Sequence, residues 1–247
     1  WQHQGDGRAL GALYRDHKGA VLYPFLLRDL ERVPYLGADF AGLHDVTTPV
    51  GFGGPLSPHG TSEETVAAFR ASFEQWCREQ RVVTEFIRFH PLLETRLMLQ
   101  RHLEIEDAGQ IVWLRLDQGG CSLIDTFSAT TRKNVRAARD AGLTFHVETS
   151  AAAYARLGDL YLDHATRRHA RPGYRYDAGH FRRLRDTLGG HQTLFGVHLG
   201  DELIAGAVFL RSPDFVHLHL AAADRRHAHS RPMNLLFFEA MQWACGL

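Results

Sequence analysis

Three arginines in the second half of the sequence have the spacing of a shared helix face. Arg132, Arg136 and Arg139 lie in a run predicted to be helical over 126–141, and separations of four and three residues bring side chains to one side of a helix. Guanidinium groups gathered in this way can bind phosphate oxygens through paired hydrogen bonds. A solvated basic surface has the same pattern, so a phosphate site and a solubilising face both remain open.

Histidine supplies a second kind of chemistry. Among the 16 histidines, His217 and His219 alternate on a strand predicted over 215–221, which places both imidazoles on one face of that strand. No cysteine or carboxylate accompanies them in a recognised zinc pattern, so no bound metal is predicted. His219 is predicted to be a general base or a substrate contact, and a hydrogen-bonded structural histidine is the alternative.

A polar pair also stands at the end of a predicted strand in the first half. Arg88 and His90 close a strand over 80–89 that Pro91 stops. Because strand ends in α/β folds border the ligand crevice, we predict that Arg88 binds substrate and that His90 is a second candidate catalytic group. The alternative for Arg88 is an ion pair with Glu85 or with a neighbour across the sheet.

The segment 47–55 contains three glycines and two prolines and is predicted to be an ordered loop. Glycine permits positive φ and a close approach of backbone to a ligand. Gly53 and Gly54 are therefore predicted to contribute to substrate binding.

Several classes of function are excluded by missing patterns. The sequence contains neither a G-x-S-x-G nucleophile elbow nor a G-x-x-x-x-G-K-[ST] phosphate loop, which argues against a serine hydrolase and an NTPase. Its three cysteines lie far apart without a C-x-x-C pair, which predicts a reducing cytoplasmic setting and no disulfide framework. The 28 basic and 28 acidic residues balance, so any site for a polyanion must be local.

The elements that must position these residues alternate between strands and helices. Strands are expected at 20–27, 80–89, 111–116, 144–148, 193–198, 203–211 and 215–221, and helices at 61–76, 126–141, 151–166, 178–188 and 232–244. This interleaving predicts mixed α/β layers.

The order of elements restarts near Asp125, which predicts one domain over 1–125 and a second over 126–247, with a cleft between them as the expected ligand site. The sequence opens without Met and closes on a helix, which predicts that both domains are truncated at these ends.

Four segments together resemble the Fem-type transferases, which belong to the acetyltransferase-like (GNAT) superfamily: the loop 48–55, the strand 85–91, the basic helix and turn 131–143, and the segment 217–236. The resemblance implies two tandem GNAT-like domains. It also implies transfer of an acyl group, often an amino acid from aminoacyl-tRNA, to an amine of a peptidoglycan precursor that carries a nucleotide or lipid diphosphate.

In the resemblance the arginine face would contact that diphosphate or the tRNA acceptor end, and Tyr176 and Asn234 are further substrate-binding candidates. No tightly bound cofactor is expected, and the co-substrate would be aminoacyl-tRNA or an acyl-CoA. The sequence departs from the family in three places. The stretch 225–232 lacks the glycines with which acetyl-CoA enzymes bind pyrophosphate, only a short loop over 169–176 stands where the family has its helical arm, and no residue matches its C-terminal Phe-Lys pair.

Two alternatives remain: a CoA-dependent N-acyltransferase that acts on a sugar or a small amine, and a binding module for RNA or a nucleotide-linked glycan. We expect a cytoplasmic protein without a membrane span.

Overall fold

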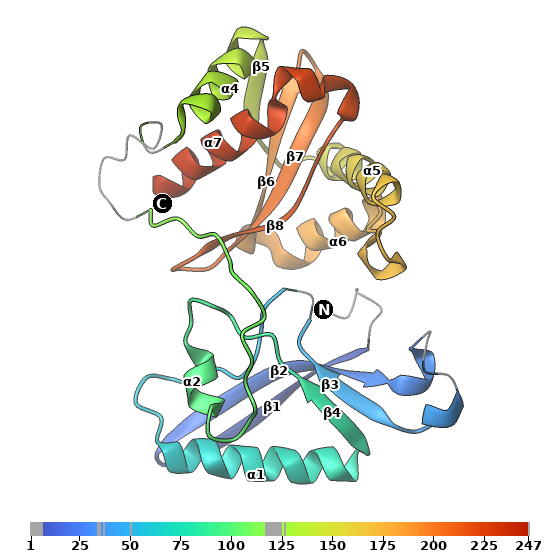
Figure 1. Cartoon of the computed structure of the whole chain (residues 1–247), viewed down its shortest axis with the longest axis vertical. Coiled ribbons are helices and arrows are strands. Elements are labelled where there is room, and N and C mark those ends of the chain that lie inside the picture. Colours follow the sequence, from blue (N-terminus) through green and yellow to red (C-terminus); the bar gives the residue numbers. More distant parts are fainter. Residues whose placement is uncertain are drawn as a thin grey trace. The chain divides into compact units, whose positions relative to one another are not determined.

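The computed structural model describes residues 7–33, 36, 38–49, 51–116, 125 and 127–246. The chain divides into two compact units, Trp1–Val112 and Trp113–Leu247, and each contains a four-stranded sheet (Figure 1). The expected domain boundary after residue 125 falls beside residues 117–124 and 126, which lie outside the described residues, so that boundary stays a prediction.

The first unit is built on a mixed sheet in the order β1-β2-β3-β4. The antiparallel ladder β1–β2 continues antiparallel into β3, and β3 and β4 are parallel. Its elements are β1 (Arg8–Asp16), β2 (Gly19–Asp29), β3 (His44–Thr47), α1 (Glu63–Glu79), β4 (Val82–Phe86) and α2 (Thr95–Leu99).

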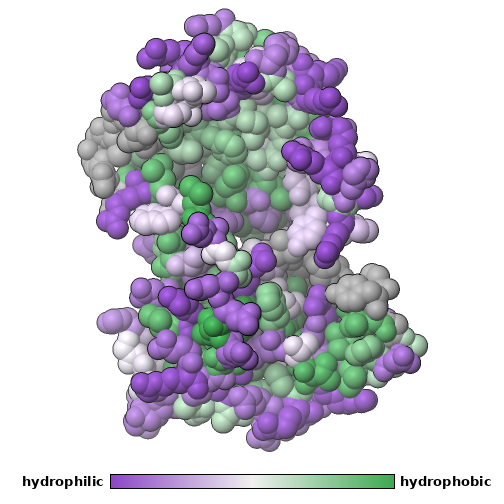
Figure 2. Space-filling model, viewed as in Figure 1, coloured by the Kyte–Doolittle hydropathy of each residue, from purple (hydrophilic) through white to green (hydrophobic). Residues whose placement is uncertain are grey.

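Helix α1 covers one face of this sheet. It begins after Ser62, whose hydroxyl accepts a hydrogen bond from the Thr65 backbone N–H at 3.2 Å, as an N-cap residue does. Val66, Phe69 and Phe73 recur at helical spacing and are buried against β2 and β3 in the core of the unit. Hydrophilic residues line most of the outward side of α1 in Figure 2, so the helix that 61–76 predicted is confirmed as an amphipathic one.

The second unit contains an antiparallel sheet in the order β5-β6-β7-β8. Gly142 ends the first helix with φ 78°, and Gly200 turns the β6–β7 hairpin with φ 58°; both are left-handed positions that favour glycine. The elements are α4 (Ala129–Asp140), β5 (Leu143–Glu148), α5 (Ala151–Arg167), α6 (Ala178–Leu188), β6 (Gln192–Leu199), β7 (Glu202–Arg211), β8 (Val216–Ala223) and α7 (Pro232–Cys245).

Two apolar cores lie on the two faces of this second sheet. Helices α4 and α7 pack on one face around Val135, Leu235 and Leu236, and α5 and α6 pack on the other around Leu157 and Phe181. Figure 1 shows the two helix pairs on opposite sides of the strands. Mixed layers of helices and strands are thus confirmed, and among the described residues no helix has the length and apolar character needed to cross a bilayer.

One expected strand is absent, and strands β1 and β3 were not predicted. The run 111–116 is not a strand, although it reads Ile-Val-Trp-Leu at its start; Val112 is fully exposed, so apolar residues alone do not make a strand where no neighbour pairs with them. Strand β1 was missed because small residues, Gly11 and Ala12, interrupt its apolar alternation. It pairs with β2 along its whole length.

Candidate functional site

Strand β8 contains an irregularity at His219. Val208 of β7 pairs with Leu220, the next residue Phe209 pairs with Leu218, and His219 is left without an opposite residue. This is a β-bulge, a feature that re-aims a side chain and is frequent beside active sites. His219 is therefore placed by the backbone and does not simply continue the ladder.

Helix α6 contributes a second histidine to the same neighbourhood. His180 is 6% exposed, and its Nε2 has no hydrogen-bond partner. Its ring stacks on Tyr176, with centroids 4.1 Å apart and planes 17° from parallel, and Tyr161 of α5 stacks on Tyr176 at 5.7 Å. These three stacked rings form a column of rings that includes a buried imidazole with an unsatisfied nitrogen.

Burial keeps these imidazoles uncharged. Loss of solvent lowers the pKa of His180 to about 4, and the nearby charge of His219 adds to this. Loss of solvent, followed by the charge of His217, lowers the pKa of His219 to about 4 as well. Both rings are neutral at pH 7, so they can form hydrogen bonds to an amine or a hydroxyl but offer no positive charge to a phosphate.

The sequence singled out His219 and Tyr176 but missed His180. The only local signal was Asp177, whose carboxylate accepts from the His180 backbone N–H at 2.8 Å and caps α6. That pattern predicts the start of a helix and places His180 in its first turn. It cannot say which strand the helix packs against.

In the first unit, the loop after β3 and the chain after β4 run together. Because β3 and β4 are parallel, their carboxyl ends lie at the same edge of the sheet. The Arg88 N–H donates to Thr48 Oγ1 at 3.0 Å, and the Gly53 N–H donates to the Arg88 carbonyl at 2.8 Å. The structure therefore brings Gly53, Gly54 and Arg88 together, as a site at this edge requires.

The glycines also have a packing role there. Gly54 has φ 112°, and a Cβ on it would lie 3.1 Å from Ile87 and 3.2 Å from Phe89; a Cβ on Gly53 would lie 3.0 Å from Thr48. Close approach of two chain segments explains both glycines without a ligand. Their part in substrate binding stays a prediction.

The polar pair at the end of β4 divides into an exposed and an engaged residue. The suggested ion pair of Arg88 with Glu85 is wrong, since Glu85 binds buried Arg70 through two contacts of 3.2 and 3.0 Å. Arg88 is exposed, with no hydrogen bond or ion pair from its guanidinium within the described part of the chain. His90 accepts a hydrogen bond from the Leu92 N–H at 3.2 Å and packs edge-on against Phe52.

Helix α4 carries the three arginines, but two of them are engaged within their own unit. Arg132 donates to the Phe127 carbonyl at 2.9 Å. Arg139 forms an ion pair with Glu239 at 2.7 Å and lies over the Phe238 ring. Arg136 is exposed and has no such contact among the described residues. Of the three arginines it is therefore the most available to bind a phosphate.

The loop before α7 adopts a backbone that the sequence did not suggest. Arg231 has φ 59°, a left-handed conformation that normally favours glycine, and it precedes Pro232 at the start of α7. Asn234 lies in the first turn, where its N–H donates to the Arg231 carbonyl at 3.1 Å. Asn234 thus stands at a helix N-terminus, where partial positive charge favours anions.

An acidic cluster at the ends of β7 and β8 is held by arginines. Glu202, Asp224 and His227 have potential ligand atoms within 4.8 Å of one another. Arg156 and Arg226 contact both carboxylates, at 2.7 to 3.3 Å, so the negative charge is already balanced. These contacts describe an ion-pair network and not an open metal site.

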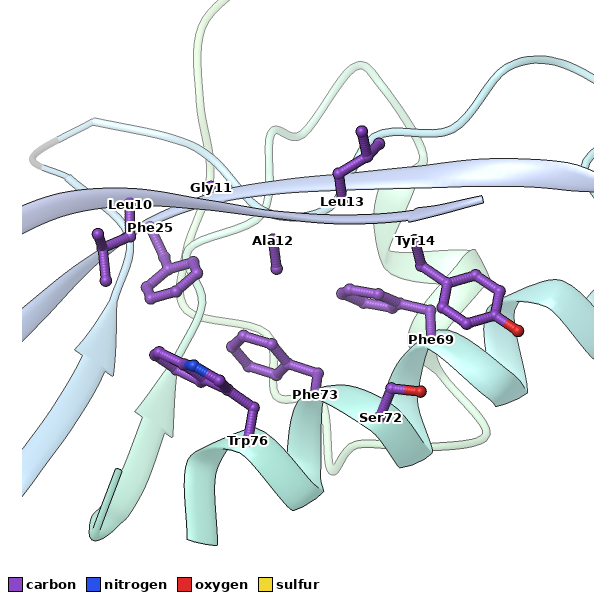
Figure 3. Close-up of a pocket in the computed structure, with 10 residues that line it drawn as sticks. All are labelled: Leu10, Gly11, Ala12, Leu13, Tyr14, Phe25, Phe69, Ser72, Phe73 and Trp76. Carbon is purple, nitrogen blue, oxygen red and sulfur yellow. The ribbon is translucent and has the colours of Figure 1, made fainter. Parts of the chain in front are cut away.

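A cavity of about 350 Å³ lies between β1 and α1 (Figure 3). Figure 3 shows the Ala12 methyl pointing from β1 toward the rings of α1 and failing to fill the space between them. The lining is uncharged and mostly aromatic or aliphatic: Leu10, Gly11, Ala12, Leu13, Tyr14, Phe25, Phe69, Ser72, Phe73 and Trp76. It supplies no acid–base pair, so the chemistry proposed below does not use it.

Comparison with known proteins identifies the second unit. Residues 126–247 match the family described as acetyltransferase (GNAT) domain. A crystal structure of FemX superposes with a TM-score of 0.67 at 13% sequence identity, over 98% of this chain and 78% of the FemX chain. The C-terminal domain (DUF2156) of a putative lysylphosphatidylglycerol synthetase from Agrobacterium fabrum gives 0.61 at 15% identity, over 99% and 69%. A search of curated proteins gave no match.

At such identities the two structures establish a shared fold, and the domain match names the family that residues 126–247 resemble. The grouping with Fem-type proteins that the four sequence segments indicated is confirmed at that level, and the findings indicate an acyl- or aminoacyltransferase. Residues 126–247, just under half of this chain, match the acetyltransferase (GNAT) domain family, and the chain shares the fold of FemX.

Proposed function

We propose that the protein transfers an acyl or aminoacyl group to an amine of a cell-wall or nucleotide-linked glycan precursor. The observation that carries the proposal is the bulge in β8, which holds His219 out of the ladder beside buried His180 on the sheet of a GNAT domain. A bulge-held imidazole beside a second neutral imidazole suits the handling of an amine proton.

The reaction would begin with attack by the lone pair of the amine on the carbonyl carbon of an activated ester or thioester. A C–N bond forms, the C–O or C–S bond to the carrier breaks, and the proton released from nitrogen ends on the leaving oxygen or sulfur. His219 is the residue we assign to carry that proton. His90, in the first unit, remains a second candidate, although its ring already accepts a backbone hydrogen bond.

Two exposed arginines are the best candidates to contact the phosphate groups of the proposed substrates. Arg88 and Arg136 are free for phosphate among the described residues, and either would suit a diphosphate or a tRNA acceptor end. In the first unit Gly53 and Gly54 accompany Arg88 as proposed binding residues, and in the second unit Asn234 accompanies Arg136. We further propose tandem GNAT-like domains over 1–125 and 126–247, aminoacyl-tRNA as donor, and a cytoplasmic location.

A CoA-dependent N-acyltransferase is the second candidate, and the loop before α7 favours it. The lack of glycine in 225–232 argued against a pyrophosphate loop. Arg231 nevertheless adopts the left-handed backbone for which such a loop uses glycine, so the missing glycine is a weaker objection than the sequence indicated.

The test is transfer to an amine with the donors offered separately. Acetyl-CoA and aminoacyl-tRNA are each combined with a UDP-linked muropeptide or a small amino sugar, and the new amide is measured by mass spectrometry. Loss of the proton carrier is expected to lower kcat by about 100-fold or more in His219→Asn, and exposed His191→Asn serves as the matched control. Full activity in His219→Asn would overturn the assignment, and binding without turnover for every donor would favour the binding module.

A further inference from the structure

We propose that His180 is the contact for the acceptor amine, and that the column of rings around it binds this amine in its uncharged form by hydrogen bonding to Nε2. The inference rests on the proposed function and names the part of the acceptor that this site would hold. The amine would then be ready to attack on arrival, because its lone pair carries no proton.

The first argument is the unsatisfied atom itself. His180 Nε2 is fully buried without a partner, and leaving such a group unsatisfied is unfavourable. The stack on Tyr176 holds the ring plane, so Nε2 cannot readily turn to water. An N–H donor from a ligand would recover this cost, whereas a hydrocarbon group would not.

The second argument is the charge around the ring. The charged or titratable groups that act on it are His219 of β8, Arg183 of α6 and Asp177, which caps α6. The Asp177 carboxylate caps the helix and favours positive charge on the ring, but loss of solvent and the Arg183 guanidinium oppose that charge more strongly. The site therefore disfavours a cation and accepts a neutral donor.

The third argument is that loss of solvent lowers the pKa of the histidine ring and of the bound amine alike. Loss of solvent lowers the pKa of His180 and of His219 to about 4, because a charged ring is poorly solvated there. An alkylammonium entering the same place meets the same penalty, so its pKa falls too. The ammonium would release its proton to the buffer on binding, and the neutral amine would donate one N–H to Nε2.

The experiment uses the full chain with butylamine as the probe and 1-butanol as its uncharged analogue. Ring-nitrogen shifts of the histidines are followed by NMR during each titration, from pH 6 to pH 9. We expect both probes to shift Nε2 of His180. The affinity for butylamine should rise about tenfold per pH unit below the pKa of the free amine, as binding coupled to loss of one proton requires, whereas the affinity for 1-butanol should not change.

A matched pair of variants tests the contact. His180→Phe keeps a flat ring on Tyr176 but removes the nitrogen, and should weaken butylamine binding about tenfold; exposed His191→Phe should leave it unchanged. Butylamine affinity independent of pH, no shift at His180 with either probe, or unchanged binding in His180→Phe would each overturn the inference. Amine binding at His180 without acyl transfer would instead defeat the proposed function alone. Transfer whose KM for the acceptor is the same in His180→Phe would defeat only this inference.

Discussion

Substitution of Gly158 by Ala should destabilise the second unit, although the same change in most helices is stabilising. Gly158 lies inside α5, where it meets the start of α6. A Cβ at this position would lie 2.4 Å from Ala178 Cα and 2.7 Å from Ala178 N. Both atoms belong to the backbone, so no side chain can rotate away and the two helices must separate.

The expected size follows from two opposing terms. Glycine in a helix interior costs about 1 kcal/mol relative to alanine, so propensity alone predicts a gain of that size. Forcing a methyl group into a close contact costs about 1–3 kcal/mol, and more where backbone must move. We expect a net loss of about 1–2 kcal/mol, together with a displacement of His180, which lies two residues beyond Ala178.

The assay combines urea unfolding with hydrogen exchange on peptides from α5 and α6. Gly190→Ala is the matched control, because a Cβ there would meet nothing within 4 Å. Gly158→Ala should lower the unfolding midpoint and speed exchange in both helices, while the control should do neither. A Gly158→Ala protein as stable as the parent, or more stable, would refute the close-packing argument.

Three further predictions follow from the same structure. Because the pKa of His180 is lowered to about 4 from a usual value of 6.5, the unfolded state binds more protons between these values, and the unfolding free energy should fall as pH drops from 6.5 toward 4; a slope unchanged in His180→Phe would contradict this. Ala12→Leu should fill part of the cavity beside α1 and raise stability by about 1 kcal/mol, measured as Tm against exposed Leu13→Ala, and a lower Tm would show that the space is not available. Arg139→Ala should cost about 1 kcal/mol through its ion pair and ring contact, whereas Arg136→Ala should leave Tm unchanged and weaken only the binding of phosphate ligands; the reverse order would be evidence against this division of roles.

Most of the fold could be predicted because local patterns determined its elements. Ser62 with apolar residues at helical spacing predicted α1, and Gly200 between two apolar runs predicted the β6–β7 hairpin. In each case a cap or turn residue coincided with the expected periodicity. Strand β1 was missed because its apolar residues do not alternate regularly. The run 111–116 was wrongly predicted because it has apolar residues but no partner strand.

The candidate site was harder to predict because it depends on contacts between distant segments. The arginine face was correctly placed on a helix, but no helical spacing could show that Glu239, about a hundred residues later, holds Arg139. His180 carries no motif and becomes notable only because Gly158 lets α6 approach α5. Chemistry that requires two elements is visible only once their packing is known.

The bulge in β8 explains how His217 and Leu220 come to lie on the same face of the sheet. Leu210 faces the α5–α6 core, and His217 lies directly opposite it, so His217 shares that face. Beyond the irregularity Leu220 also packs on that core. A regular ladder cannot place residues 217 and 220 on one face, because side chains alternate. The extra residue at His219 absorbs the mismatch. Alternation predicted a shared face for His217 and His219, and it could not show the bulge that separates His219 from the ladder, because a bulge depends on the pairing with β7.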